Sequence, residues 1–211
     1  MTDILKSIRS YFEMEKESGI SEYLFASKSK DARLSLAKNG VAYCRKCPLG
    51  KMRINSVFGS GNINAKLMFV GEAPGHDEDL QGMPFVGEAG ILLTKIIEAM
   101  GIKREDVYIC NILKCRPPHN RNPLPEEIST CINYLYAQID VVKPKIICGL
   151  GKFASCTLLN TETPISKLRG SWHEYRGLKF MPTYHPAYLL RNPWDKKLVW
   201  EDMKKIMKEL M

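Results

Sequence analysis

The feature that most constrains the fold is an alternation, from residue 66 onward, between short apolar runs and longer stretches with helical periodicity. The apolar runs have the length of buried strands and span 66–70, 107–113, 145–150 and 180–184. The helical stretches span 88–100, 125–140, 152–159 and 195–210. Strands that alternate with helices are typical of a parallel sheet covered on both faces. We therefore predict an α/β protein with a three-layer α/β/α architecture and a central four-stranded, mainly parallel sheet.

The beginning of the chain has a different pattern, that of two amphipathic helices at 3–16 and 21–38 with a Ser-Gly pair between them. We expect residues 1–40 to form a helical N-terminal extension and residues 41–211 to form one domain. A chain of 211 residues, 45% of them hydrophobic, is long enough to bury one substantial core.

Hydropathy and charge limit the partners of the protein. Its apolar stretches are far shorter than the ~18 to 20 residues that cross a bilayer, and its N-terminus lacks the pattern of a secretory signal. We therefore expect a cytoplasmic protein without a membrane partner, and a monomer as the default. The net charge of +8 favours a polyanion such as nucleic acid. Because many soluble proteins are rich in lysine, the location of the charge must decide whether it indicates binding to nucleic acid.

The cysteines indicate a metal centre. Seven cysteines, an odd number, argue against a disulfide framework. Cys44 and Cys47 form a C-x-x-C pair that can reach one metal from a single turn, and Cys115 and Cys131 provide a second pair. This spacing leaves both zinc and an iron–sulfur cubane open. The remaining cysteines lie in or beside predicted strands and helices, where cysteine is usually a small buried apolar residue: Cys110, Cys148 and Cys156.

Unusual segments follow the predicted strands, and ligands of parallel sheets bind beyond the carboxyl ends of the strands. Gly71-Glu72-Ala73-Pro74-Gly75 follows the first strand, and His185-Pro186-Ala187 follows the last. Asn111 and then Lys114-Cys115-Arg116-Pro117-Pro118 lie at the end of the second strand. We therefore expect the functional site at this edge of the sheet.

Together with the run Gly82-Met83-Pro84-Phe85-Val86-Gly87, these segments resemble the family 4 uracil-DNA glycosylases, and the resemblance spans about residues 41–210. It implies a DNA-repair hydrolase that cleaves the N-glycosidic bond of uracil in single- and double-stranded DNA and leaves an abasic site. Glycosylases that also cleave the strand usually do so through a lysine Schiff base, and the resemblance assigns no lysine this role. We therefore expect a monofunctional glycosylase, without a lyase step. It also implies that Cys44, Cys47, Cys115 and Cys131 hold a [4Fe-4S] cluster, with zinc as the alternative.

The resemblance gives three residues roles at the base. His185 resembles the catalytic histidine, which donates a hydrogen bond to uracil O2 as negative charge develops there. The amide of Asn111 matches uracil N3–H and O4, whereas cytosine presents the opposite polarity at both positions. Phe85 resembles the aromatic platform that stacks on the extruded uracil, a contact worth roughly 1 to 3 kcal/mol. Without this context, a histidine at the end of a strand is more often structural, and Asn111 is equally well explained as an asparagine that caps a strand. Phe85 would then be an ordinary core phenylalanine.

The residue that activates water is less clear from the sequence. Family 1 glycosylases carry an aspartate two positions after the first glycine of the corresponding motif, and here that position is Ala73. Glu72 is the first candidate to orient water and Asn120 the second. Glu78 also matches a functional position, where it can crowd uracil C5 and exclude the thymine methyl group. Gly71, Gly75, Gly82 and Gly87 allow the backbone to approach the base and phosphates closely, or simply form turns. We expect Gly71, Glu72 and Ala73 to contact the substrate.

Basic side chains fall in the same loops, where a phosphate track should run. Leu189 and Leu190 resemble the loop that enters the minor groove, where an apolar wedge fills the space left by the extruded nucleotide. The other interpretation is that these leucines start a helix that packs on the core. A second function stays open, that of an iron–sulfur module that recognises uracil in DNA without excising it, because Ala73 replaces the aspartate. The basic residues that we expect to contact DNA are Lys114, Arg116, Arg121, Lys167, Arg169 and Arg191.

Overall fold

The computed structural model describes residues 29–211, so the expected helix at 3–16 and the first part of that at 21–38 lie outside the described residues. Helix α3 (Lys30–Ala42) begins after Ser29, whose hydroxyl oxygen accepts a hydrogen bond from the backbone N–H of Ala32. The boundary that we expected between residues 40 and 41 falls inside this helix. Leu34 and Val41 of α3 are buried in the core of the domain.

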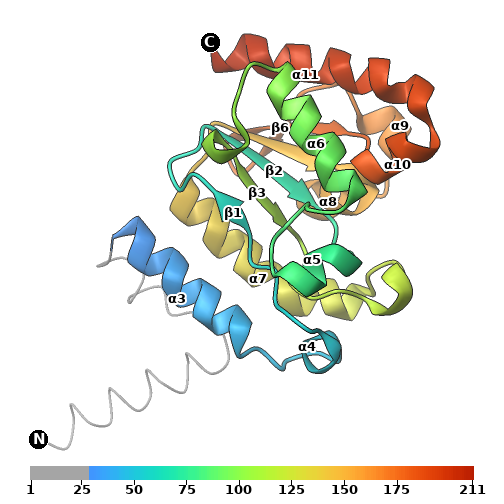
Figure 1. Cartoon of the computed structure of the whole chain (residues 1–211). Coiled ribbons are helices and arrows are strands. Elements are labelled where there is room, and N and C mark those ends of the chain that lie inside the picture. The colour runs from blue at the N-terminus through green and yellow to red at the C-terminus, as the bar shows by residue number, and fades with distance from the viewer. Residues whose placement is uncertain (1–28) are drawn as a thin grey trace, which may run out of the picture.

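Within residues 29–211, one sheet of six strands forms the middle layer (Figure 1). The order across the sheet is β1-β3-β2-β4-β6-β5. The strands are β1 (Ser60–Gly61), β2 (Leu67–Gly71), β3 (Tyr108–Asn111), β4 (Ile146–Leu150), β5 (His173–Tyr175) and β6 (Leu178–Thr183). Four of them, β3, β2, β4 and β6, are parallel neighbours, and these are the four predicted strands.

The prediction of four strands was wrong in number because it omitted β1 and β5. Both are antiparallel edge strands, of two and three residues respectively. Such short strands contain no run of alternating or apolar residues from which they could be recognised.

The four predicted helices downstream of residue 66 are confirmed within two residues at each end, as α6, α7, α8 and α11. The α-helices after α3 are α4 (Leu49–Met52), α5 (His76–Gln81), α6 (Glu88–Ala99), α7 (Pro125–Val142), α8 (Gly151–Leu159), α9 (Ile165–Leu168), α10 (Pro186–Arg191) and α11 (Lys196–Leu210). Three short 3₁₀ helices complete the described part of the chain: η1 (Arg104–Asp106), η2 (Pro118–Asn120) and η3 (Pro193–Asp195).

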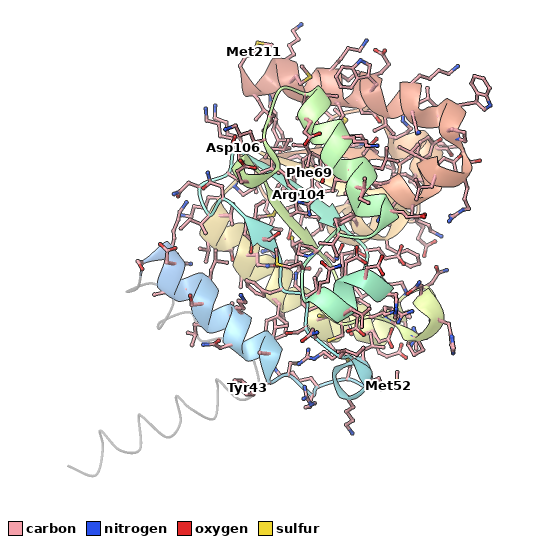
Figure 2. All side chains as sticks on the ribbon, viewed as in Figure 1. Tyr43, Met52, Phe69, Arg104, Asp106 and Met211 are labelled. Atoms are coloured by element: carbon pink, nitrogen blue, oxygen red, sulfur yellow. The ribbon has the colours of Figure 1, made fainter. Side chains whose placement is uncertain are left out.

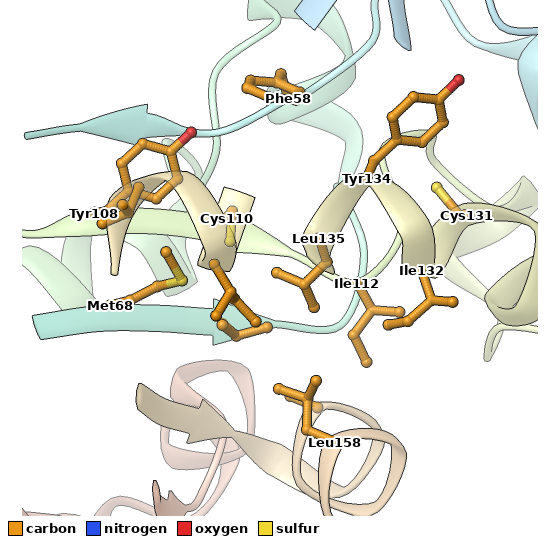
Figure 3. Packing of buried hydrophobic residues seen from close by; sticks show 14 of the residues in the cluster. Phe58, Met68, Tyr108, Cys110, Ile112, Cys131, Ile132, Tyr134, Leu135 and Leu158 are labelled. Atoms are coloured by element: carbon orange, nitrogen blue, oxygen red, sulfur yellow. The ribbon is translucent and has the colours of Figure 1, made fainter. Parts of the chain in front are cut away.

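Helices cover both faces of the sheet, as Figure 1 shows. Successive strand residues point to opposite faces, and in β2 Met68 packs with α3, α7 and α8 while Phe69 packs with α6 and α11. Figure 3 shows residues of the first of these layers, among them Met68 of β2, Leu135 of α7 and Leu158 of α8. The three-layer α/β/α architecture is therefore confirmed. Among the described residues, no helix is both long and apolar enough to cross a membrane.

Candidate active site

Four of the predicted site residues meet at the carboxyl ends of the strands. Gly71 and Asn111 are paired in register at the ends of β2 and β3. A Cβ atom placed on Gly71 would lie 2.3 Å from Oδ1 of Asn111 and 2.5 Å from Cζ of Phe85. The ring of Phe85 lies beside that of His185, with 5.6 Å between the centroids. Since any side chain at position 71 would collide with its neighbours, glycine is required where these elements converge.

Asn111 presents an acceptor that has no partner. The residue is only 2% exposed, and its Oδ1 is buried without a hydrogen bond in the described part of the chain. A buried acceptor left in this state costs ~1 to 3 kcal/mol, so such atoms are uncommon in folded proteins. The Asn111 amide oxygen is therefore prepared to accept a hydrogen bond from a ligand.

His185 is a neutral donor held by the start of α10. Its Nδ1 accepts a hydrogen bond from the backbone N–H of Ala187, 3.1 Å away, so the proton of the neutral ring is on Nε2. Burial, reinforced by the positive charge of Arg191, lowers the pKa of His185 from 6.5 to about 4. At neutral pH the imidazole can therefore donate through Nε2 without carrying a charge.

The loop that carries Phe85 has a constrained backbone. Phe85 has a φ of 52°, in the left-handed region that costs an ordinary residue roughly 1 to 2 kcal/mol. Its ring is 6% exposed and packs in the core. A Cβ atom on Gly90 of α6 would lie 2.0 Å from the carbonyl oxygen of Phe85, so the loop also needs this glycine behind it.

Glu78 holds this loop from one side. Its Oε1 accepts hydrogen bonds from the backbone N–H groups of Val86 and Gly87, at 2.8 and 2.9 Å. Its Oε2 accepts from the N–H of Gly75, at 3.0 Å, at the start of α5. Both oxygens are thus bonded to backbone, and the visible contacts of Glu78 are those of a residue that positions the loop.

Arg104 holds the same loop from the other side, and no motif in the sequence pointed to it. Its guanidinium donates to the carbonyl oxygens of Pro84 and Phe85, at 2.7 and 2.9 Å. It also donates to the hydroxyl of Thr94 in α6, at 2.8 Å, and Figure 2 shows Arg104 alongside that helix. Glu78 and Arg104 together bond the backbone groups on both sides of the strained residue, and we call this pair the Phe85 clamp.

The two candidates for water activation differ in their surroundings. Glu72 is partly buried next to Gly71, and burial raises its pKa from 4.5 to about 7. Its carboxylate makes no hydrogen bond with any other described residue. Oδ1 of Asn120, by contrast, accepts a hydrogen bond from Nε of Arg116 at 2.8 Å. The neighbouring Ala73 has no polar side chain and packs against the core.

Three of the basic residues expected at DNA are occupied elsewhere. Lys114 is fully buried, and its Nζ donates to the carbonyl of Asn111 at 2.6 Å and to Oε1 of Gln138 at 2.5 Å. Lys114 therefore cannot reach a phosphate, and it supports the backbone of Asn111 instead. Gln138, which sequence reasoning did not single out, also donates to the carbonyl of Phe58 at 2.8 Å.

Arg169 and Arg121 are both paired with buried carboxylates. Arg169 forms a two-pronged ion pair with Asp202 of α11, which also accepts from the hydroxyl of Thr183 at 2.7 Å. Arg121 donates to both oxygens of Glu127 at 2.9 and 2.6 Å. Their guanidinium groups therefore already have partners within the fold, and the expected role of these two arginines at DNA stays a prediction.

The other basic candidates remain available to a ligand. Lys167 and Arg191 are exposed, and Leu190 is 43% exposed at the end of α10. Arg116 is partly exposed and bridges η2 to α5, with 3.0 Å between its Nη1 and Nδ1 of His76. Leu190 and Arg191 belong to α10, which directly follows His185, and Lys167 belongs to α9, whereas Leu189 of α10 is fully buried.

The four cysteines predicted to bind a metal lie in one region. Cys115 and Cys131 are in the core cluster, and Cys44 and Cys47 pack against it. Burial, with smaller contributions from the nearby Cys115 and Cys44 thiols, raises the pKa of Cys131 to about 12. Burial likewise raises the pKa of Cys115, to which Cys47 and Cys44 contribute. Among the described residues, no group of three or more His, Cys, Asp or Glu side chains has the arrangement of a site for a single metal ion.

Two donors already face the sulfur atoms. Nη1 of Arg53 lies 3.0 Å from Sγ of Cys115, and the same guanidinium donates to the carbonyls of Val41 and Cys44. The backbone N–H of Lys114 donates to Sγ of Cys131 at 3.3 Å. N–H groups aimed at sulfur stabilise the thiolate form, which is the form that binds a metal.

Comparison with known proteins places the chain in a class. The model of the uracil DNA glycosylase superfamily matches residues 58–204, which is more than half of the chain, and the protein belongs to that superfamily. Its relatives define the family more closely. The chain is 44% identical to the type-4 uracil-DNA glycosylase of Thermotoga maritima, with 84% of this chain and 94% of the relative aligned.

Two archaeal relatives agree with this assignment. Identity is 47% to the type-4 uracil-DNA glycosylase of Archaeoglobus fulgidus, over 77% of this chain and 86% of the relative. The chain is 46% identical to the type-4 uracil-DNA glycosylase of Saccharolobus solfataricus, over 84% of this chain and 86% of the relative. The chain therefore belongs to the type-4, or family 4, uracil-DNA glycosylases, as its motifs predicted.

Proposed function

We propose that this protein is a DNA-repair enzyme that hydrolyses the N-glycosidic bond of uracil in single- and double-stranded DNA, releases free uracil and leaves an abasic site. The observation that carries the proposal is the unpartnered Oδ1 of Asn111, buried beside Phe85 and His185. Uracil offers a donor at N3–H, which this acceptor fits, whereas the unprotonated N3 of cytosine would face it with a second acceptor. Family membership supports the same reaction.

The enzyme must extrude the nucleotide, because the glycosidic bond is inaccessible in the base stack. We infer that the extruded uracil stacks on Phe85 and bonds to Asn111, with the backbone at Gly71 against the base. Gly71 leaves room for this approach because it has no side chain.

As the glycosidic bond breaks, the departing uracil takes up negative charge and the sugar acquires oxocarbenium character. In the proposed reaction, His185 donates through Nε2 to uracil O2, where that charge develops. The ring does this as neutral imidazole, since its pKa is about 4. A neutral donor stabilises the anionic base without first protonating it.

Water must attack the sugar from the side opposite the base. We assign its orientation to Glu72, whose carboxylate makes no other hydrogen bond with the described residues. Asn120 is the weaker candidate, since its oxygen already accepts from Arg116. A carboxylate with a pKa of about 7 is a better proton acceptor at neutral pH than an ordinary glutamate.

The first test is release of base from an end-labelled oligonucleotide that contains one uracil, with the wild-type protein and the His185→Ala variant. Wild type should release uracil, and the variant should release it at least a hundredfold more slowly. The same assay with Glu72→Gln and Asn120→Ala ranks the two water candidates. Tight binding of the uracil strand by wild type without release would instead support the alternative, a recognition module that does not excise.

We further propose that Cys44, Cys47, Cys115 and Cys131 hold a [4Fe-4S] cluster, with zinc as the alternative. The fit rests on the shared location of the four thiols and on the N–H donors that face Cys115 and Cys131. A cluster with four protein thiolates has no open coordination position, so its contribution would be to cross-link the segments that carry them.

Elemental analysis and colour distinguish the two metals. Anaerobically purified wild type should be brown and contain iron, and Cys131→Ala should lose both the colour and part of its thermal stability. Colourless protein with one equivalent of zinc would refute the iron–sulfur assignment. Full colour and stability in Cys131→Ala would refute the set of ligands.

A further inference from the structure

The site described so far does not use Trp194, the tryptophan of η3. Its side chain is 86% exposed. Tryptophan is usually well covered in folded proteins, since it has the largest apolar surface to remove from water. An indole left this open is suited to a partner with a flat apolar surface.

Trp194 is presented by a rigid turn rather than by a loose loop. The hydroxyl of Tyr188 in α10 donates to Oδ2 of Asp195 at 2.7 Å, and the side-chain amide of Asn192 donates to the carbonyl of Tyr188 at 3.0 Å. The ring of Tyr188 packs on that of Tyr184, with 4.7 Å between the centroids. The turn is thus fastened to the helix that His185 begins.

Positive charge surrounds the indole. We call residues 190–197 the Trp194 segment, and it contains three basic side chains against one acidic one. Arg191, Lys196 and Lys197 are exposed, whereas the carboxylate of Asp195 bonds to Tyr188. An aromatic ring among free cations is the combination that binds single-stranded nucleic acid, in which bases stack on rings and phosphates meet lysine and arginine.

The distance from the site also fits a DNA strand. The six residues of α10 advance the chain by ~9 Å at 1.5 Å per residue, and η3 then folds back on Tyr188. The length of α10 corresponds to about three nucleotide steps of 3.4 Å along a strand.

We propose that Trp194 stacks on an unpaired base of the DNA strand, a few nucleotides from the extruded uracil, while the cations of the Trp194 segment bind the adjacent phosphates. This inference rests on the proposed function for the choice of DNA as partner. It goes beyond it by adding a second stacking site outside the base pocket. Since every base has a flat face, the contact does not depend on uracil.

The test uses the full chain and a fluorescently labelled single strand that contains thymine in place of uracil, so that no excision is needed. Fluorescence anisotropy gives the Kd for wild type and for Trp194→Ala. We expect the Kd to rise about tenfold in Trp194→Ala, because stacking is lost, and Trp194→Phe to recover most of the affinity. The matched control is Trp172→Ala, at a tryptophan that is 38% exposed and lies over Lys179, and it should bind as wild type does.

A second measurement reports on the indole itself. In the Trp172→Phe, Trp200→Phe double variant, Trp194 is the one remaining tryptophan of the chain. Addition of the unlabelled strand should quench its fluorescence and protect it from acrylamide.

An unchanged Kd in Trp194→Ala, or an indole that stays open to acrylamide with DNA bound, would overturn the inference. A tenfold loss of affinity in both Trp194→Ala and Trp172→Ala would also overturn the inference. These outcomes are independent of base release. If the protein excises uracil normally but fails the stacking tests, the proposed function stands and the stacking role of Trp194 is refuted.

Discussion

Replacement of Arg104 by methionine tests whether the Phe85 clamp controls catalysis. The change keeps an apolar stem and removes the guanidinium that donates to the carbonyls of Pro84 and Phe85. Since Arg104 is partly exposed and water can replace some of its bonds, we assign ~1 kcal/mol to each of the two. Phe85 also gains roughly 1 to 2 kcal/mol whenever it leaves its left-handed conformation. This strain is present in wild type and variant alike, so the two lost bonds set the difference. The productive conformation of the loop should be destabilised by about 2 kcal/mol, which lowers kcat/KM by up to about 30-fold.

The assay is single-turnover release of uracil, with kcat/KM measured for wild type, Arg104→Met and Glu78→Gln. The kcat/KM of both variants should fall, because each variant removes one half of the Phe85 clamp. The matched control is Glu105→Gln, an exposed neighbour in η1, which should act as wild type does.

Two results would refute the reasoning. If Arg104→Met kept the wild-type kcat/KM, the left-handed conformation of Phe85 would not need the clamp. If Glu78→Gln alone became active on thymine, Glu78 would act by crowding uracil C5, as its position in the motif suggested, rather than through the loop.

Three further predictions follow from the site. The single-turnover rate should rise with pH through about 7, as Glu72 loses its proton, and Glu72→Gln should abolish this rise. His185, with a pKa of about 4, is neutral throughout that range and should add no step to it. Lys114→Met should lower the free energy of unfolding by ~1 to 3 kcal/mol in thermal denaturation, since it leaves buried acceptors unpaired, and should leave the salt dependence of DNA binding unchanged. Gly71→Ala should abolish base release, because the new methyl group would occupy the space between Asn111 and Phe85; normal release would show that the base binds elsewhere.

The architecture could be predicted because its signal is local. Each central strand is a short apolar run buried on both faces, and each covering helix has an apolar stripe. The edge strands β1 and β5 could not be found in this way, because two or three residues carry no period. Motifs predicted the residues at the ends of the strands, since parallel strands bring their carboxyl ends to one edge.

The partners of charged residues could not be predicted, because they come from distant segments. Lys114 and Arg169 look like phosphate contacts in the sequence, yet they meet Gln138 and Asp202 in the folded protein. Arg104 carried no motif at all, although it bonds to the loop of Phe85 from 19 residues further along the chain. Burial decides such cases, and burial depends on the whole fold.

The order of the strands along the chain separates the parts of the site in time during synthesis. A ribosome delivers the chain from its N-terminus, so Phe85 and Asn111 emerge well before β6 and the imidazole of His185 that follows it. Helix α11, which buries Val199 and Ile206 against the same layer, emerges later still. A nascent chain therefore holds the side chains proposed to read the base before it holds the one proposed to act on it.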